Sequence, residues 1–398
     1  MLSLSLILLH LVLFAADNAY VIDTSGSLVE IDLVSGAVNP GVAVLGNYPN
    51  DILYFDGFVY VINSGSDDSA LQRINVENWQ IENLAIGSGY NCWGEEFLSS
   101  DTLLISATLN NSLIIVSTEP LSVLSEIPGV GPCPEWMCLT EDFAWVACGG
   151  WGSDNNLVRV DLTTMAVSDT IEVEVNCQSV AYDGIDELFV VNSGTYGNNE
   201  GSISIINAVS GNVTENLSTG GFPSTICIRD NKAYIGDGWG PGVYVITTDT
   251  HEVLHNSSNP VFTGGTGFDI DSSGNLFVSD TMNGQVRAYD QNDQLLISYS
   301  VSNPGALAVN GCLTGIEIND PIPSTEYLRV SPTPTSSVIT VTGATPGEDI
   351  LVFDLTGRCM ESSITDESGT SVLSTSNLPE GIYTVVSGNL SARITVLR

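Results

Sequence analysis

The sequence predicts an all-β protein: a seven-bladed β-propeller closed by its N- and C-terminal strands, followed by a small immunoglobulin-like β-sandwich. Three observations predict this fold. A short apolar strand recurs seven times, the copies are spaced by the length of one propeller blade, and a new set of short strands follows the last repeat. This pattern leaves no room for a helical fold.

The recurring strand is rich in β-branched and aromatic residues, as strands are. Its copies begin 40, 44, 41, 44, 45 and 43 residues apart, and a four-stranded blade takes roughly 40 to 45 residues. Such a sheet has two apolar faces that it cannot bury alone, so the copies must stack around an axis. The seven copies are Ala19–Asp23, Val59–Asn63, Leu103–Ala107, Ala144–Cys148, Leu188–Asn192, Ala233–Asp237 and Leu276–Asp280.

The second repeat shows the order of strands within a blade. Strands are expected at 49–55, 58–63, 71–75 and 80–86, with Asp56-Gly57 as the first turn. The first repeat lacks an opening strand, whereas a surplus one, Pro304–Val309, follows the last repeat. We therefore expect Pro304–Val309 to become the innermost strand of the first blade, which seals the ring and removes exposed sheet edges.

The domain boundaries follow from composition. Residues 1–16 are predicted to be a secretory signal peptide, because the apolar run is too short to span a bilayer and ends in small residues. Residues 17–313 form the propeller and 314–326 a linker. Residues 327–398 contain strands at 328–330, 338–341, 349–354, 382–386 and 392–397, which predict the sandwich. No later stretch is long enough for a transmembrane span.

The chain is strongly acidic, with 9 Lys and Arg against 47 Asp and Glu and a net charge of −38. Such a surface repels nucleic acid and anionic lipid, so neither is an expected partner. It is typical of a solvated surface in a saline or calcium-containing exterior, and we favour this explanation over a specific cation site. No cofactor is predicted, although a calcium ion would suit the acidic loops.

The eight cysteines are an even number in a chain predicted to be exported, which permits disulfides. Four of them lie near one end of neighbouring blades, where a bridge is expected: Cys92, Cys133, Cys148 and Cys177. The alternative is that the cysteines are free and buried, and it is favoured for three that lie in apolar strands: Cys138, Cys227 and Cys359.

The repeat alignment sorts the loops onto two faces. One face has tight turns, and the other carries long, varied loops together with the segments that enter each innermost strand. Four of the six tryptophans fall on this second face, where function is expected to concentrate, although tryptophans can also wedge blades together. The predicted ligand-binding residues of this face and of the channel mouth are Asn50, Asp51, Trp93, Glu95, Glu135, Trp136, Trp151, Gln178, Ser224, Trp239 and Thr266.

Two resemblances add to this prediction. The strands Val59–Asn63, Leu188–Ser193 and Ser202–Asn207 resemble the YVTN/NHL-type repeats of secreted bacterial propellers, over residues 19–309. The segments 330–334, 350–358, 378–383 and 392–398 resemble the C-terminal sorting domain of proteins exported by type IX secretion, with Thr333 in place of the usual asparagine. The second resemblance implies recognition by the secretion machinery and release or attachment at the cell surface.

Catalytic motifs find little support. His251-Glu-Val-Leu-His255 matches the zinc-protease pattern H-E-x-x-H, but that pattern requires a helix. The alignment places it in the outermost strand of a blade, where four residues span about 13 Å and cannot bring both imidazoles to one ion. No phosphate-binding glycine loop is present, and no other histidine follows the signal peptide to support a Ser-His-Asp scheme.

The sequence therefore favours a secreted or cell-surface binding module, without catalysis, for a protein or glycan ligand that it does not identify. The rival is a metal-dependent hydrolase or lyase at the channel mouth. There Asp51, Glu95 and Glu135 would hold a divalent ion, as in gluconolactonase-like propellers. A purely structural surface role is a third possibility.

Overall fold

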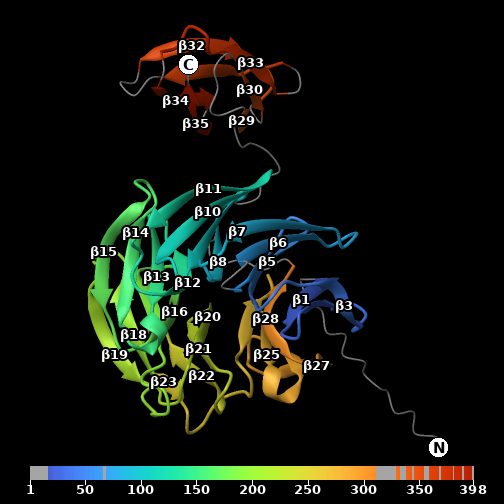
Figure 1. The fold of residues 1–398 in the computed structure, drawn as a ribbon, viewed down its shortest axis with the longest axis vertical. Helices are drawn as coiled ribbons and strands as arrows, with labels where there is room; N and C mark the ends of the chain where they lie inside the picture. Colours follow the sequence, from blue (N-terminus) through green and yellow to red (C-terminus); the bar gives the residue numbers. More distant parts are fainter. Residues whose placement is uncertain are drawn as a thin grey trace, which may run out of the picture. The chain divides into compact units, whose positions relative to one another are not determined.

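The computed structural model describes residues 17–65 and 69–310, and in the C-terminal part 329–331, 338–342, 345–353, 358–366, 369–379, 381–387 and 390–396. The expected signal peptide and linker lie outside these residues. The chain divides into two compact units, Met1–Glu317 and Ile318–Arg398 (Figure 1). The described residues include no helix long and apolar enough to cross a membrane.

Seven four-stranded antiparallel sheets lie within the described residues of 17–310, and together they form a propeller. Sheet 1 contains β28 (Pro304–Val309), β1 (Asn18–Asp23), β2 (Ser27–Asp32) and β3 (Val38–Val44); sheet 2, β4 (Pro49–Phe55), β5 (Phe58–Asn63), β6 (Ser69–Asn75) and β7 (Ile81–Gly87); sheet 3, β8 (Cys92–Ser99), β9 (Thr102–Ala107), β10 (Ser112–Thr118) and β11 (Leu121–Pro128); sheet 4, β12 (Pro134–Leu139), β13 (Phe143–Cys148), β14 (Asn156–Asp161) and β15 (Ala166–Glu172).

The remaining sheets continue the same order. Sheet 5 contains β16 (Cys177–Tyr182), β17 (Glu187–Asn192), β18 (Ser202–Asn207) and β19 (Val213–Ser218); sheet 6, β20 (Thr225–Arg229), β21 (Lys232–Asp237), β22 (Gly242–Thr247) and β23 (Val253–His255); sheet 7, β24 (Gly267–Ile270), β25 (Leu276–Asp280), β26 (Gln285–Tyr289) and β27 (Leu295–Ser300). Two 3-10 turns, η1 (Gly150–Gly152) and η2 (Thr281–Asn283), follow β13 and β25. The strands predicted for the second repeat are confirmed to within two residues.

The predicted closure of the ring is confirmed. Strand β28 pairs antiparallel with β1, with Ala19 opposite Val309 and Val21 opposite Leu307. Just beyond β28, the Asn310 side-chain oxygen accepts hydrogen bonds from the backbone amides of Asp17 and Asn18, at 2.9 and 2.8 Å. The first strands of all seven sheets contact one another in a closed series, β28–β4–β8–β12–β16–β20–β24–β28, and the sheets are arranged around a common axis (Figure 1).

The core lies between neighbouring sheets, because successive side chains of a strand point to opposite faces. In β5, Val59 and Val61 pack in the cluster shared with sheet 1, whereas Tyr60 and Ile62 pack in the cluster shared with sheet 3. All four are almost completely buried. Each recurring strand therefore supplies apolar residues to two interfaces, which explains why it reads as a continuous apolar run.

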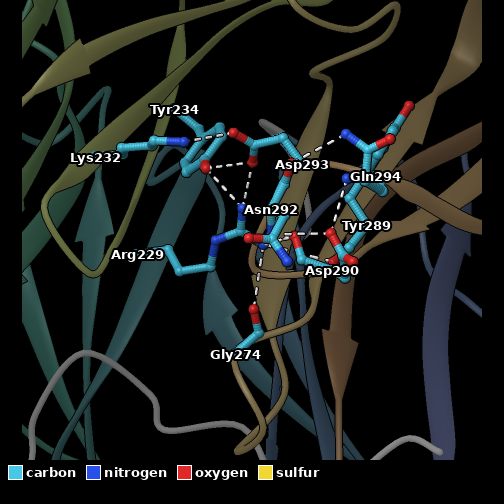
Figure 2. A network of polar contacts seen from close by, with 9 residues as sticks. All are labelled: Arg229, Lys232, Tyr234, Gly274, Tyr289, Asp290, Asn292, Asp293 and Gln294. Atoms are coloured by element: carbon cyan, nitrogen blue, oxygen red, sulfur yellow. Dashed lines mark hydrogen bonds and ion pairs between the residues drawn. The ribbon is translucent and has the colours of Figure 1, made fainter.

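A buried arginine joins sheets 6 and 7 at their tight-turn ends (Figure 2). The Arg229 guanidinium donates to the carbonyl oxygens of Gly274 and Asp290, at 3.2 and 3.0 Å, and forms an ion pair with Asp293. The Tyr234 hydroxyl and the Lys232 ammonium each donate to the Asp293 carboxylate at 2.6 Å. The side chains of one sheet thus satisfy backbone carbonyls of the next.

The C-terminal unit is a sandwich of two antiparallel sheets. One contains β29 (Arg329–Ser331), β30 (Val338–Thr342) and β33 (Ser371–Ser374), and the other β32 (Cys359–Ile364), β31 (Asp349–Phe353), β34 (Gly381–Ser387) and β35 (Leu390–Val396). Residues from both sheets, including Ile339, Val352 and Tyr383, share one apolar core. Strands β32 and β33 were not predicted, because Glu and Ser interrupt their apolar pattern.

No disulfide joins any two of the seven cysteines within the described residues, so the bridge expected among Cys92, Cys133, Cys148 and Cys177 is not present there. Cys148 and Cys177 are nevertheless neighbours, since the Cys148 amide donates to the Cys177 sulfur at 3.3 Å. The thiols of Cys138, Cys227 and Cys359 are free as predicted, but Cys138 and Cys227 are only half-buried and Cys359 is exposed. Cys312 lies outside the described residues.

Candidate functional site

The central channel contains a cavity of about 290 Å³ lined by residues of all seven innermost strands. All seven contribute because the first strand of every sheet lies next to the axis. Five of the predicted site residues line this cavity: Asn50, Asp51, Glu95, Trp136 and Thr266. These five residues therefore lie along the channel, where the repeat alignment placed them.

Asp51 connects three innermost strands. One carboxylate oxygen accepts from the Glu95 amide of β8 at 3.0 Å, and the other from the Ile52 amide at 3.0 Å. The Trp136 side chain, from β12, also hydrogen bonds the carboxylate. Burial raises the pKa of Asp51 to about 7, although these hydrogen bonds oppose the shift.

Two glutamates from β8 lie beside Asp51. Burial, assisted by the neighbouring carboxylates of Asp51 and Glu96, raises the pKa of Glu95 well above its ordinary value. Burial, Asp51 and Asp269 raise the pKa of Glu96 to about 8. Glu95 is 3% exposed, and neither carboxyl oxygen has a hydrogen-bond partner within the described part of the chain. Both glutamates are therefore harder to ionise than an exposed glutamate.

Asp269 in β24 repeats the bridging role of Asp51 and was missed in the sequence. Its carboxylate accepts from the Ile270 amide at 2.8 Å and from the Val309 amide of β28 at 2.7 Å. It therefore ties sheet 7 to the closing strand. In the strand register, Asp269 lies two residues further along its innermost strand than Asp51 does. The repeat alignment therefore did not place the two aspartates at the same position.

Glu135 was expected at the channel mouth but is buried away from the channel cavity. Burial alone raises its pKa to about 8. The carboxyl group interacts electrostatically with the thiols of Cys133, Cys148 and Cys177. Across the described residues, no three His, Cys, Asp or Glu side chains are grouped so that they could hold a metal ion.

A second cavity of about 440 Å³ opens on the loop face above sheets 1 to 4, and we call it the aromatic cavity. It is shallow and lies where the ends of innermost strands meet the loops of neighbouring sheets. Its lining residues are Thr24, Tyr48, Pro49, Asn50, Ser64, Asn91, Trp93 and Trp151. Three of these eight, Asn50, Trp93 and Trp151, were predicted as site residues.

The tryptophans of this region form a packed cluster. The Trp93 ring lies edge-on to both Trp136 and Trp151, with centroids 5.7 and 6.3 Å apart. Trp136 lines the channel, whereas Trp151 is 62% exposed in the turn η1. The cluster therefore joins the two cavities. Trp239 is more exposed, at 77%, but lines neither of them.

Some polar groups that line the aromatic cavity are held by hydrogen bonds, whereas two polar atoms have no partner among the described residues. The Asn50 amide donates to the Trp93 carbonyl at 2.7 Å, and the Ser64 backbone amide donates to the Tyr48 carbonyl at 2.8 Å. By contrast, the buried Ser64 hydroxyl and the Trp93 indole nitrogen have no partner among the residues that the structure describes. A buried polar atom without a hydrogen-bond partner costs free energy, so a ligand that formed a hydrogen bond with either atom would bind more tightly.

Three of the predicted residues form hydrogen bonds within the scaffold, and one of them, Thr266, also lines the channel cavity. Gln178 donates to the Asn176 side chain at 2.9 Å, and the Ser224 carbonyl accepts from the Ser179 hydroxyl of sheet 5 at 2.8 Å. The Thr266 hydroxyl is a partner of Thr281 at 2.8 Å. Tyr48, Ser64 and Asn91 were missed. Their only signal in the sequence was that they are polar or aromatic residues in loops, which many other loop residues share.

The two histidines of the H-E-x-x-H segment have different surroundings. His251 precedes β23, and its two ring nitrogens contact Glu187 at 2.7 Å and Glu215 at 3.0 Å, both in sheet 5. His255 donates from Nδ1 to the Asn259 carbonyl at 2.9 Å. The placement of the segment at the outermost strand is confirmed, with β23 pairing only with β22 among the described strands.

A family model for the secretion system C-terminal sorting domain matches residues 329–395. The C-terminal unit is a secretion sorting domain. Domains of this family mark proteins for export by the type IX secretion system. The protein is therefore secreted to the cell surface or the extracellular space. No curated protein matches the sequence.

Solved structures confirm the propeller fold at low sequence identity. A protein of unknown function from Desulfotomaculum acetoxidans is 13% identical with a TM-score of 0.58, covering 74% of this chain and 99% of its own. A quinoprotein alcohol dehydrogenase-like protein from Bacteroides thetaiotaomicron is 14% identical with a TM-score of 0.53, covering 74% and 78%. Virginiamycin B lyase from Staphylococcus aureus is 13% identical with a TM-score of 0.51, covering 65% and 87%.

Proposed function

We propose that this secreted propeller is a binding protein that takes its ligand in the aromatic cavity on the loop face. The observation that carries the proposal is the cluster of Trp93, Trp136 and Trp151 beside two unpaired buried polar atoms. Ligand sites are concave, contain aromatic side chains and place a few polar groups among them. The sorting domain supports an extracellular ligand, because it delivers the propeller to that compartment.

The arrangement of Trp151 argues against a purely structural role for this ring. A tryptophan that wedges sheets together would be buried, whereas Trp151 is mostly exposed and sits at a backbone φ of 56°, a conformation that favours glycine. The turn is held by the Asp154 amide, which donates to the Gly149 carbonyl at 3.1 Å. Backbone strain that presents an exposed aromatic ring supports a contact with another molecule.

The test compares the full chain with Trp151→Ala on an oligosaccharide array and on an array of extracellular proteins. We expect at least one array member to bind the wild-type protein and to lose most of its binding to the variant. Tyr196→Ala is the matched control, because Tyr196 is an exposed aromatic residue outside both cavities. If no member shows binding that depends on Trp151, the proposal is wrong.

The rival function, a metal-dependent hydrolase or lyase in the channel, has one observation in its favour. Asp51 and Glu96 have pKa values raised to about 7 and 8, and acid–base catalysis works best with groups that titrate near the operating pH. Turnover of a lactone or glycan that is lost both with a chelator and in Asp51→Asn would establish this function. Absence of turnover with added calcium, manganese or zinc would exclude it for those substrates.

A further inference from the structure

We infer that the aromatic cavity binds an uncharged sugar unit of a neutral glycan, an inference that rests on the proposed function. The first argument is charge. The chain carries 47 acidic residues, yet none of the eight described residues that line this cavity has a carboxylate, ammonium, guanidinium or imidazole group. A site for a charged ligand would contain an opposite charge, so this lining fits a neutral polar molecule.

The second argument is the pair of exposed aromatic rings at the rim. Tyr48 is 78% exposed and Trp151 is 62% exposed. A pyranose ring has a face of C–H groups that carries partial positive charge, which suits the negative face of an aromatic ring. A sugar can therefore cover these rings with its apolar face and keep its hydroxyl groups at the edge.

The third argument is the supply of hydrogen-bonding groups. The Ser64 hydroxyl can donate and accept, and the Trp93 indole nitrogen can donate, and within the described chain neither has a partner. Thr24 adds an exposed hydroxyl, and the side-chain amide of Asn91 is oriented by its 2.6 Å hydrogen bond to Thr108. Hydroxyl and amide groups are what a ring bearing several hydroxyls requires, because each sugar hydroxyl both donates and accepts.

The fourth argument is size and rigidity. A cavity of about 440 Å³ suits one or two sugar units, whereas a folded protein partner usually covers about 800 Å² of each surface. The Trp93 ring packs edge-on against both Trp136 and Trp151 and so holds the Trp151 ring in place, which limits the conformational entropy lost on binding. The net charge of −38 also disfavours acidic polysaccharides, which leaves neutral glycans as the favoured class.

The experiment titrates the full chain with neutral oligosaccharides of two to six units built from glucose, mannose, galactose or N-acetylglucosamine. Binding is followed by tryptophan fluorescence and calorimetry. We expect one of these sugars to bind and to change the fluorescence, because Trp93 and Trp151 line the site. We also expect the affinity to change little between low and high salt, since a neutral ligand has no charge to screen.

Matched variants locate the site. Trp151→Ala and Tyr48→Ala should each weaken binding by about tenfold or more, the loss expected when a stacking ring is removed. Trp151→Phe should retain part of the affinity, and Tyr196→Ala should leave it unchanged. Thermal melting of each variant shows that the propeller is intact, so loss of binding cannot be assigned to unfolding.

The outcomes separate this inference from the proposed function. If no neutral sugar binds but a protein binds and loses affinity in Trp151→Ala, the glycan inference is overturned and the proposed binding role stands. If a sugar binds equally well to wild type and to both rim variants, the cavity assignment is overturned. If neither sugars nor proteins show binding that depends on Trp151, both proposals fall.

Discussion

The buried Glu135 makes the stability of the propeller depend on pH. Its carboxyl group is buried next to thiols, and one oxygen has no hydrogen-bond partner among the described residues. Burial raises its pKa from 4.5 to about 8. Between these values the folded protein keeps a proton that the unfolded chain releases, so the free energy of unfolding falls as the pH rises through this window. Asp51, Glu95 and Glu96 act in the same direction.

Glu135→Gln should therefore flatten the pH dependence of stability. The variant cannot ionise, so at pH 8 we expect it to be more stable than wild type by on the order of 1–2 kcal/mol, with the difference vanishing towards pH 5. Urea unfolding followed at several pH values measures this. The control is Glu77→Gln, which changes an exposed glutamate in a turn. Parallel pH profiles for wild type and Glu135→Gln would contradict the prediction.

At the scale of the strand and sheet, polar links complement the apolar interfaces. Arg229 connects sheet 6 to the turns of sheet 7, and His251 connects sheet 6 to Glu187 and Glu215 of sheet 5. Burial lowers the pKa of His251, but hydrogen bonds and the charges of the two glutamates outweigh it and raise the pKa overall. Each link therefore depends on a charge that is satisfied only when two sheets are correctly stacked.

Arg229→Met should be strongly destabilising. Arg229 is 4% exposed, and its loss leaves Asp293 without its buried partner and leaves the carbonyls of Gly274 and Asp290 without a donor. We expect a loss of about 3 kcal/mol or more in the free energy of unfolding. Lys232→Met removes the more exposed partner of the same carboxylate and should cost at most about 1 kcal/mol. Equal losses in the two variants, measured by urea unfolding, would refute this ranking.

The propeller unit as a whole is held together by its closing strand. Sheet 1 takes β28 from the end of the propeller and β1 to β3 from its start, so the first and last sheets cannot separate without breaking the β28–β1 pairing. Asn310 reinforces this pairing through the amides of Asp17 and Asn18. Closure therefore covers the edge of β1 that would otherwise lack a neighbouring strand.

Two truncations test the role of the closing strand. A chain ending at residue 317 keeps the complete propeller unit, and we expect it to unfold in one cooperative thermal transition. A chain ending at residue 303 lacks β28 and should lose this transition or show a large fall in melting temperature, because β1 and the neighbouring core residues become exposed. Circular dichroism melting of both chains measures the effect. Similar melting temperatures would show that closure contributes little.

Part of the candidate site could be predicted from the sequence. Asn50, Trp93 and Trp151 were found because aligned repeats place their loops on the same face. Tyr48, Ser64 and Asn91 were missed, since they are ordinary loop residues until the neighbouring sheets bring them together. Trp239 shares the predicted face but lines neither cavity, because a loop's face does not determine its position around the ring.

The sequence by itself determined the recurring strands of the propeller, their grouping into repeats and the closing of the ring. These features depend on local periodicity and on a repeat length that only stacked sheets can satisfy. The tertiary structure alone decided which side chains share a cavity and which carboxyl groups are buried. Those properties depend on contacts between residues about 40 or more positions apart, such as Asp51 with Glu95 and Asp269 with Val309. Only the stacking of sheets around the axis sets these distances.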